Sequence, residues 1–417
     1  MQPQACPANP LPASTEVASG STIAVAMPFL TMLGAMAIVP AIRPMFAVNG
    51  AGEGAMHAFM SVNMLGAAIG APLVSWGADR LGAHRRFALF LALADALLIG
   101  ACALPLAVGP MLLVRTLQGA ANVGVLSILM AMATRSPGQT SGTHSRLGAA
   151  GAAMTAAIAL GPPLGGLLLG WGPRAPFFAA AVLNAVVALL VWTHARAPGP
   201  REPRIDRRAI VSRSPLLAVP MVLGFTERFT VGCFVVSFAI YAHEALGFTD
   251  RETSLRFTLF VAPFALAMYP MWKASERFSR AALMSAGGLF YGVSFLLLAV
   301  TRGAALDVTL ILCGLASAMM YAPSLCYAGS LAPPGGRATS MALFNAAGCL
   351  GMMLGPAVAG ILSAVLRDAG YGAAIRYPAI FAVAGVVQLV AMLALARPIA
   401  KLRAAERVAA LPEQVHA

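Results

Sequence analysis

Charged residues are scarce in this sequence. Aspartate, glutamate, lysine and arginine make up 10% of its 417 residues, whereas a soluble protein carries about 25%. Hydrophobic residues make up 59%, and the mean hydropathy is +0.80. A soluble core could not bury so much apolar sequence, so the composition excludes a soluble protein and indicates one that lies in a lipid bilayer.

Paired cysteines and nucleotide-binding loops are also missing. None of the six cysteines has the spacing of a zinc site or a disulfide framework, so we expect small buried hydrophobic side chains. The six histidines do not cluster at the spacing of metal ligands. No GxxxxGK(S/T) loop is present, which argues against ATP as the energy source. We therefore expect no metal and no cofactor.

Long charge-free runs predict membrane-spanning helices. A helix needs about 20 mostly apolar residues to cross a bilayer, whereas barrel strands would alternate polar and apolar residues over about ten positions. The runs do not alternate, so we expect an all-α integral membrane protein with twelve transmembrane helices. The expected spans are 22–42, 56–77, 87–107, 110–133, 147–170, 176–195, 215–241, 257–272, 281–301, 308–328, 340–364 and 377–396.

Basic residues are distributed unevenly between the loops. The net charge of +13 could suit nucleic acid, but it is spread over short segments between spans, which argues against such a partner. If both termini are cytoplasmic, 19 Lys and Arg residues lie on the cytoplasmic side and seven on the other. This asymmetry follows the positive-inside rule, so we expect both termini in the cytoplasm. The seven are Arg43, Arg174, Arg251, Arg256, Arg302, Arg367 and Arg376.

One polar segment divides the chain into two apolar halves. Residues 196–214 hold six arginines and three prolines, and we interpret them as a cytoplasmic linker. The first 20 residues lack Lys and Arg, unlike the basic start of a cleaved signal peptide. We therefore expect a disordered tail at 1–20, six-helix bundles at 21–195 and 215–396, and a cytoplasmic tail at 397–417.

The two halves repeat each other. The stretch WGADRLGAHRR at 76–86 returns as WKASERFSR at 272–280, with an offset of 197 when the acidic residues are aligned. GPPLGG at 161–166 returns as GPAVAG at 355–360, with an offset of 194. Two matches at nearly one offset indicate an internal repeat. Parallel six-helix repeats around a site near the bilayer midplane are typical of secondary transporters.

Small, charged and glycine residues follow the second expected span. They are Ser75, Asp79, Arg80, Gly82, Arg85 and Arg86. In this order they resemble the signature of the major facilitator superfamily, and the resemblance extends over nearly the whole chain. Two departures are Ser75, where the family has Gly, and the pair Ala83 and His84, which delays the basic residues. The resemblance implies two pseudo-symmetric six-helix bundles.

The fourth span carries a second motif. Arg115, Gln118 and Gly119 are similar to the Arg-x-x-Gln-Gly motif of the superfamily. The resemblance places this span at a central cavity, together with spans one, seven and ten. Arginine does not readily lose its proton, so Arg115 either orients a carboxylate there or bonds to backbone carbonyls of neighbouring helices.

A glycine-proline motif occurs in the fifth span and again in the eleventh. It is similar to the signature of the proton-coupled drug antiporters, although Ala157 stands where that branch has a further Gly. Proline bends a helix and glycine lets another helix approach closely, so both copies would shape the interface between the bundles. The motif residues are Gly161, Pro162, Gly165, Gly166, Gly355 and Pro356.

Few ionisable residues lie within the spans, and such residues are costly unless they face protein or water. Glu227 and Arg228 lie near the middle of the seventh span. A carboxyl in a dry cavity can bind and release a proton as access alternates, so Glu227 is the candidate for proton coupling; the alternative is a permanent pair with Arg115 or Arg228. For Asp95 in the third span we favour a polar packing contact over a proton relay.

Two further features complete the candidate site. Asn122 and Asn345 are modest candidates for lining the cavity. Asp79 lies at the negative end of its own helix, where a carboxylate is unfavourable. In the family fold its expected neighbour is the start of the eleventh span, near Thr339 and Ser340, where it would latch the outward-open state.

These features predict a transporter of the bacterial inner membrane. We expect a monomeric proton antiporter that exports small amphipathic compounds, with the proton gradient as its energy source. The partners are the lipid bilayer and a small-molecule substrate. A dedicated exporter of one metabolite such as a siderophore, an uptake permease, and a non-transporting membrane sensor remain alternatives; a membrane enzyme is more remote because no catalytic constellation is visible.

Overall fold

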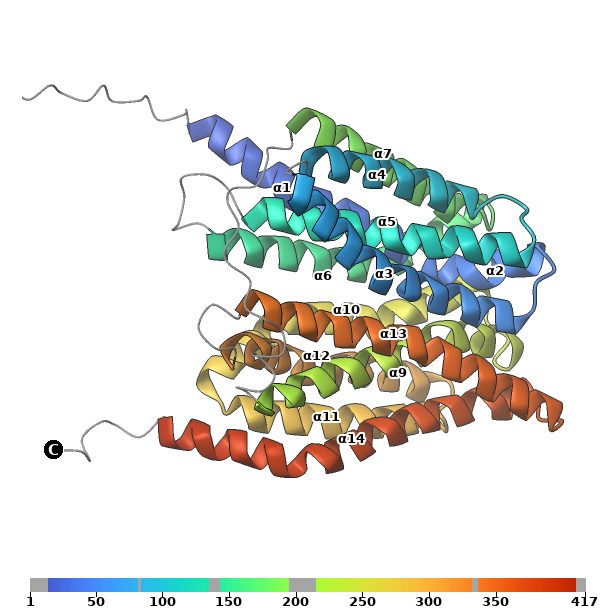
Figure 1. Ribbon diagram of the computed structural model, residues 1–417. Coiled ribbons are helices and arrows are strands. Elements are labelled where there is room, and N and C mark those ends of the chain that lie inside the picture. Colours follow the sequence, from blue (N-terminus) through green and yellow to red (C-terminus); the bar gives the residue numbers. More distant parts are fainter. Residues whose placement is uncertain (1–13, 82–83, 135–142, 195–214, 332–336, 410–417) are drawn as a thin grey trace, which may run out of the picture.

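The computed structural model describes residues 14–81, 84–134, 143–194, 215–331 and 337–409 (Figure 1). Helices are the regular elements throughout these ranges, and twelve of them are long. The predicted all-α class with twelve long helices is therefore confirmed. The expected linker lies outside the described residues, as do residues 1–13 and 410–417.

The helices follow the same order in the two halves of the chain. The N-terminal half contains α1 (Ser14–Ala37), η1 (Val39–Ala41), α2 (Ile42–Val48), α3 (Glu53–Leu81), α4 (His84–Ala101), α5 (Val108–Thr134), α6 (Thr143–Leu168), η2 (Leu169–Trp171) and α7 (Ala175–His194). The C-terminal half contains η3 (Pro215–Leu217), α9 (Ala218–Glu244), α10 (Asp250–Arg277), α11 (Arg280–Leu298), α12 (Ala304–Ser330), α13 (Arg337–Asp368) and α14 (Ala373–Ala409).

The same helix pairs pack together in both halves. In the N bundle, α1 packs on α6, α3 on α5, and α4 on α7; in the C bundle, α9 packs on α13, α10 on α12, and α11 on α14. The bundles lie side by side and touch through two reciprocal pairs, α3 with α13 and α6 with α10 (Figure 1). The repeat in the sequence therefore corresponds to two bundles with the same helix packing.

Two ends of the molecule can be distinguished in Figure 1. The termini end, at the left, is where α1 begins and α14 ends; the distal end lies opposite. Turns at the distal end are short, and five contain a glycine with positive φ, a conformation that side chains disfavour. These glycines are Gly50, Gly172, Gly247, Gly303 and Gly370.

Ten of the described helices are long and apolar enough to cross a membrane. The other two long helices of the described residues, α3 and α4, with 29 and 18 residues, are not among these ten and pack beside them in the N bundle (Figure 1). Several spanning helices contain proline, which the packed bundles accommodate because neighbouring groups satisfy the freed backbone carbonyls.

Glycines of the Gly-Pro motif bring equivalent helices into close contact in the two bundles. A Cβ atom on Gly161 would lie 2.2 Å from Cβ of Met36 on α1, and one on Gly355 would lie 2.3 Å from the backbone oxygen of Phe229 on α9. Each copy therefore fixes the fifth helix of a half against the first. The last glycine of each copy makes contact across the bundle interface: Gly166 packs on Ser254 of α10, and Gly360 packs on His57 of α3.

Both expected tails are partly helical. α14 continues well beyond residue 396 because Glu406 anchors it: the carboxylate accepts hydrogen bonds from Ser279 Oγ (2.6 Å), the Arg280 backbone (3.0 Å) and Tyr327 OH (2.5 Å). The expected tail at 397–417 is thus an extension of α14 as far as Ala409. At the other terminus α1 already begins at Ser14, inside the expected tail at 1–20.

The first prediction concerns the Gly161 contact. Gly161→Ala should lower the free energy of unfolding by about 1–3 kcal/mol, because an added methyl group forces α1 and α6 apart. Gly151→Ala on the same helix is the matched control, since its Cβ would meet nothing within 4 Å. Thermal unfolding in detergent measures both, and equal stability of the two variants would contradict this packing.

Candidate functional site

Glu227 lies in the core of the C bundle. The residue is 2% exposed on α9. Its Oε1 accepts a hydrogen bond of 3.1 Å from Ser317 of α12, while its Oε2 lies 3.3 Å from Nε of Arg228 without hydrogen-bond geometry. Of the two partners expected for a permanent pair, the structure shows Arg228.

Arg228, the neighbour of this carboxylate, is half-buried. Its side chain is 28% exposed, donates a hydrogen bond of 3.2 Å to Tyr321 OH, and lies over the Tyr321 ring at 5.1 Å. Gly348 on α13 leaves space for the side chain, because a Cβ there would lie 3.2 Å from Cγ of Arg228. Within this pair, the Glu227 carboxylate is buried and the Arg228 side chain is half-buried.

Arg115 belongs to a separate polar network inside the N bundle. It is 4% exposed and donates a hydrogen bond of 2.6 Å to Oε1 of Gln118, which also accepts from Asn63 at 2.8 Å. Asp95 of α4 accepts from Gln118 at 2.6 Å and from Asn122 at 2.7 Å. Asp95, expected to make a peripheral packing contact, thus joins the Arg115 motif.

The remaining predicted residues have varied positions. Gly119 packs on the backbone of Asn63, and Asn345 is exposed on α13. Arg80, Arg85 and Arg86 are exposed, and Arg85 donates a hydrogen bond to the backbone oxygen of Trp192. Gly82 and the Asp79 side chain lie outside the described residues, so the expected latch is not described; the Ser340 hydroxyl donates to the Ala328 backbone at 2.5 Å.

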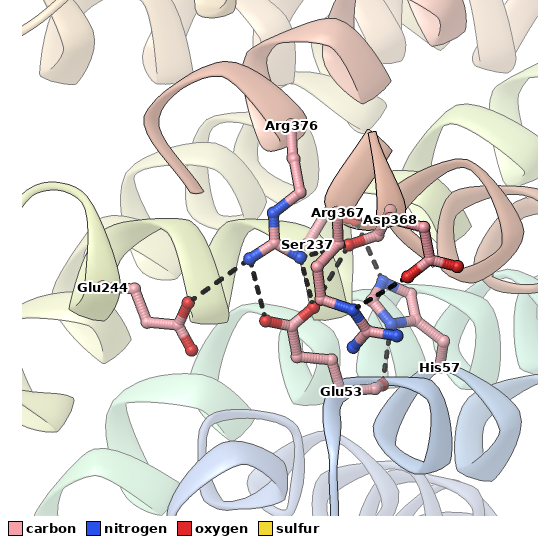
Figure 2. A network of polar contacts seen from close by, with 8 residues as sticks. Glu53, His57, Ser237, Glu244, Arg367, Asp368 and Arg376 are labelled. Atoms are coloured by element: carbon pink, nitrogen blue, oxygen red, sulfur yellow. Dashed lines mark hydrogen bonds and ion pairs between the residues drawn. The ribbon is translucent and has the colours of Figure 1, made fainter. Parts of the chain in front are cut away.

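Arg376 forms the main ionic contact between the bundles. Its guanidinium, on α14, donates to both carboxylate oxygens of Glu53 on α3, at 2.7 and 3.1 Å. Ser363 of α13 lies within hydrogen-bond distance of both partners, and Glu244 of α9 lies 3.9 Å from the guanidinium. Figure 2 shows Arg376 between the carboxylates of Glu53 and Glu244. Four helices from both bundles meet here at the distal end.

A second ionic contact joins the bundles at the same end. Arg43 of α2 lies 2.7 Å from Asp250, the first residue of α10. One turn further along α10, Ser254 donates a hydrogen bond of 2.6 Å to the backbone oxygen of Pro162 on α6. That carbonyl belongs to the Gly-Pro motif, so the motif contributes directly to distal contact.

His57 lies buried between these contacts. Its Nδ1 is 3.0 Å from the backbone oxygen of Glu53, and its Nε2 is 3.2 Å from Ser237 Oγ on α9. The carbonyl can only accept, so Nδ1 carries the hydrogen and Nε2 accepts from Ser237. Gly360 of α13 packs on the ring. We call this set of contacts the distal gate. Its residues are Glu53, Arg376, Ser363 and Glu244, His57 and Ser237, Arg43 and Asp250, and Ser254 with the Pro162 carbonyl.

The helix faces that meet at the distal gate are exposed towards the termini end. On α13, Ser363 is buried in the gate, whereas Asn345, about five turns away on the same face, is exposed. On α10, Ser254 is buried against α6, whereas Trp272, again about five turns away, is 46% exposed. Both helices at the interface therefore diverge from the other bundle towards the termini.

Sequence reasoning missed the distal gate. In the sequence, Arg43 and Arg376 serve only to indicate which loops lie outside the cytoplasm. Glu53 and Asp250 lie before the expected second and eighth spans. One signal was available, because acidic residues accompany the few arginines of the loops on that side. Their pairing could not be inferred, since Glu53 and Arg376 are 323 positions apart.

Two repeated six-helix bundles that meet at a closed polar gate define a membrane transporter. The sequence pattern of the Major Facilitator Superfamily matches residues 24–226 and again residues 220–414. The chain belongs to the Major Facilitator Superfamily, whose members are transporters rather than enzymes.

Individual relatives agree with this assignment. An uncharacterised MFS-type transporter of Methanocaldococcus jannaschii is 31% identical over 143 residues, which are 34% of this chain and 37% of the relative. This match therefore spans little more than a third of the relative's length.

Solved structures are similar over most of the chain. A mutant of the nucleoside transporter NupG has a TM-score of 0.75 at 13% identity, with 91% of this chain and 99% of that chain covered. A bacterial homologue of the human lysosomal transporter Spinster, inward-facing and unoccupied, has 0.76 at 15%, with 95% and 98% covered. A D-xylose–proton symporter has 0.70 at 15%, with 89% and 97% covered. At these identities the likeness shows the fold.

The second prediction tests the ion pair of the distal gate. Glu53→Gln should increase the distance between spin labels at Val48 and Tyr371, which are exposed on opposite bundles at the distal end. The cause is that Arg376 loses its closest counter-charge while nearly buried. Glu252→Gln is the control, because Gln also serves in the capping box of α10. An unchanged distance distribution in Glu53→Gln would show that the pair does not hold the gate.

The third prediction tests close packing in the gate. A Cβ on Gly166 would lie 2.3 Å from Ser254 Oγ, whereas one on Gly170 would meet nothing within 4 Å. Gly166→Ala should therefore populate the separated arrangement by the same distance measurement, and Gly170→Ala should not. The same distribution in both variants would contradict the close contact of α6 with α10.

Proposed function

We propose that the protein is a proton-driven exporter of small amphipathic compounds, working by alternating access in the inner membrane of a bacterium. It acts as a monomer and needs no cofactor besides the proton gradient. The observation that carries the proposal is the two-ended interface: helix faces buried in the distal gate are exposed towards the termini. Such an interface can open at one end as it closes at the other.

The orientation follows from the distribution of charge. The 19 basic residues of the termini side favour the cytoplasm over the seven of the distal side. In that orientation the distal gate faces outward, and a closed distal gate makes the arrangement inward-facing. When the gate opens, Glu53, Arg376 and His57 become exposed to water. Hydration of these groups then compensates for the contacts that they lose.

Glu227 is suited to bind the transported proton. The carboxylate is buried, its Oε2 lacks a hydrogen bond, and the half-buried Arg228 side chain lies beside it. A proton on Glu227 removes the counter-charge of Arg228, so the local charge changes by one unit in a region of low dielectric. Protonation therefore changes the electrostatic energy of the C bundle substantially.

Two helices connect this carboxylate with the distal gate. α9 carries Glu227 and, about 25 Å further along at 1.5 Å per residue, Glu244. α13 carries Gly348 beside Arg228 and Ser363 beside Glu53. Because both helices are continuous over these positions, a shift at the Glu227–Arg228 pair reaches the gate. This supports coupling of proton binding to gate opening.

The Gly-Pro motif supports export as the direction of transport. Its resemblance is to proton-coupled drug antiporters, and its Pro162 carbonyl forms part of the distal gate. The rival function is proton-coupled uptake. It would use the same buried acid, but proton and substrate would move in the same direction across the membrane. The two differ in which pH gradient drives accumulation.

The fourth prediction tests coupling. In proteoliposomes screened over amphipathic compounds, an imposed pH gradient should drive substrate movement against the proton flux, and Glu227→Gln should abolish this accumulation while leaving protein in the membrane. The exposed Glu252→Gln serves as control. Undiminished accumulation in Glu227→Gln would exclude Glu227 as coupling group, and accumulation in the direction of proton flux would establish uptake in place of export.

A further inference from the structure

A second buried carboxylate lies in the N bundle. Asp95 on α4 is 0% exposed. Its Oδ1 accepts from the Gln118 amide and its Oδ2 from the Asn122 amide. Unlike Glu227, it is held by neutral amides rather than by a direct ion pair. Neutral donors stabilise a buried carboxylate less than a contacting cation does.

Each helix packed on α4 contributes specific groups to this region. From α5 come Gln118, Asn122 and the guanidinium of Arg115, which reaches Asp95 only through Gln118. α3 contributes the Asn63 amide, and α7 holds no charged residue before His194. Just after the end of α4, the Cys102 thiol lies near Arg115. The described cluster therefore contains one acid and one base.

We propose that Asp95 is a proton-binding site reached past Asn122, and that protonation of Asp95 releases Arg115 from the network of the N bundle. This goes beyond the coupling role proposed for Glu227, because it gives each bundle its own proton site.

Asn122 can accommodate the proton without loss of a hydrogen bond. Asn122 is half-buried, whereas Asp95 and Gln118 are fully buried. The proton would therefore reach Asp95 past the Asn122 side chain. A proton on Oδ2 turns that oxygen into a donor. A half-turn of the Asn122 amide then presents its oxygen as acceptor in place of its NH2 group. Gln118 cannot turn as freely, because its oxygen already accepts from Arg115 and Asn63.

Arg115 loses its counter-charge when Asp95 becomes neutral. The cluster then carries one uncompensated positive charge, which is costly in the interior of a bundle. The direct contacts of Arg115 are to neutral groups: its guanidinium donates to the Gln118 amide oxygen and lies over the Phe59 ring of α3 at 4.6 Å, while its Nε lacks a hydrogen-bond partner. Movement of the Arg115 side chain towards water would lower the cost of this charge. The same movement would withdraw the guanidinium from the Phe59 ring.

This movement would act on the helix that carries the distal gate. Phe59 is two residues from His57 and less than two turns from Glu53 on α3. Losing the cation–π contact with Arg115 loosens α3 where it meets α9 and α14. Proton binding in the N bundle would thus favour opening of the gate.

Infrared difference spectroscopy of the full chain in phosphatidylethanolamine–phosphatidylglycerol liposomes tests the proton site, with the proton itself as the probe. On mild acidification the wild type should gain a protonated-carboxyl band that shifts on carbon-13 labelling of aspartate. The band should be lost in Asp95→Asn and kept in Glu227→Gln. A band unaffected by aspartate labelling, or retained in Asp95→Asn, overturns the proposal, and the labelled wild type decides even if a variant does not fold.

The release of Arg115 is tested by thermal unfolding of a double-mutant cycle. Asp95→Asn and Arg115→Gln should each lower the midpoint, because each leaves one buried charge, and the double variant should recover part of the loss. Additive losses would show that Arg115 does not depend on the charge of Asp95. Neither measurement needs a substrate, so a failure of the proposed export function would leave this result intact.

Discussion

The ion pair between Glu53 and Arg376 is the interaction on which the arrangement of the two bundles depends. It joins residues from opposite halves of the chain, where Arg376 is almost completely buried. The pair brings together α3 of the N bundle with α13 and α14 of the C bundle, because Ser363 of α13 lies within hydrogen-bond distance of both partners. With the contacts of Arg43, Ser254 and His57, this pair closes the distal end of the interface.

The helices within each bundle approach one another closely. Gly161 and Gly355 allow backbone contact within each half, whereas Ser254 and Pro162 join the halves through one hydrogen bond. In the proposed alternating access, dense packing inside the bundles and polar contacts between them would concentrate movement at the interface. The polar contacts are also those that water can replace, which apolar packing could not allow at the same low cost.

Much of the fold could be predicted from the sequence, because charge-free runs and short basic loops are local properties. The repeat was visible because Gly161 and Gly355 stand at equivalent positions. The gate was not predictable, because the partner of Arg376 depends on how the two bundles meet. The contact of Asp95 with the Arg115 motif was not predictable, because its partners on α5 depend on the rotation of α4. The extension of α14 had a weak signal in the apolar spacing of Ile399 and Leu402, both buried, but the partners of Glu406 lie on other helices.

The anchored end of α14 gives the C bundle a rigid external arm. Glu406 ties the last turns of this helix to the start of α11 and to α12, so the exposed residues Arg403, Ala404 and Ala405 cannot move independently of that bundle. A fluorophore on this arm would follow the rotation of the whole bundle rather than the fraying of a terminus. The end of α14 is therefore a suitable labelling position for time-resolved measurements of the C bundle, on a different helix from Glu227 and Asp95.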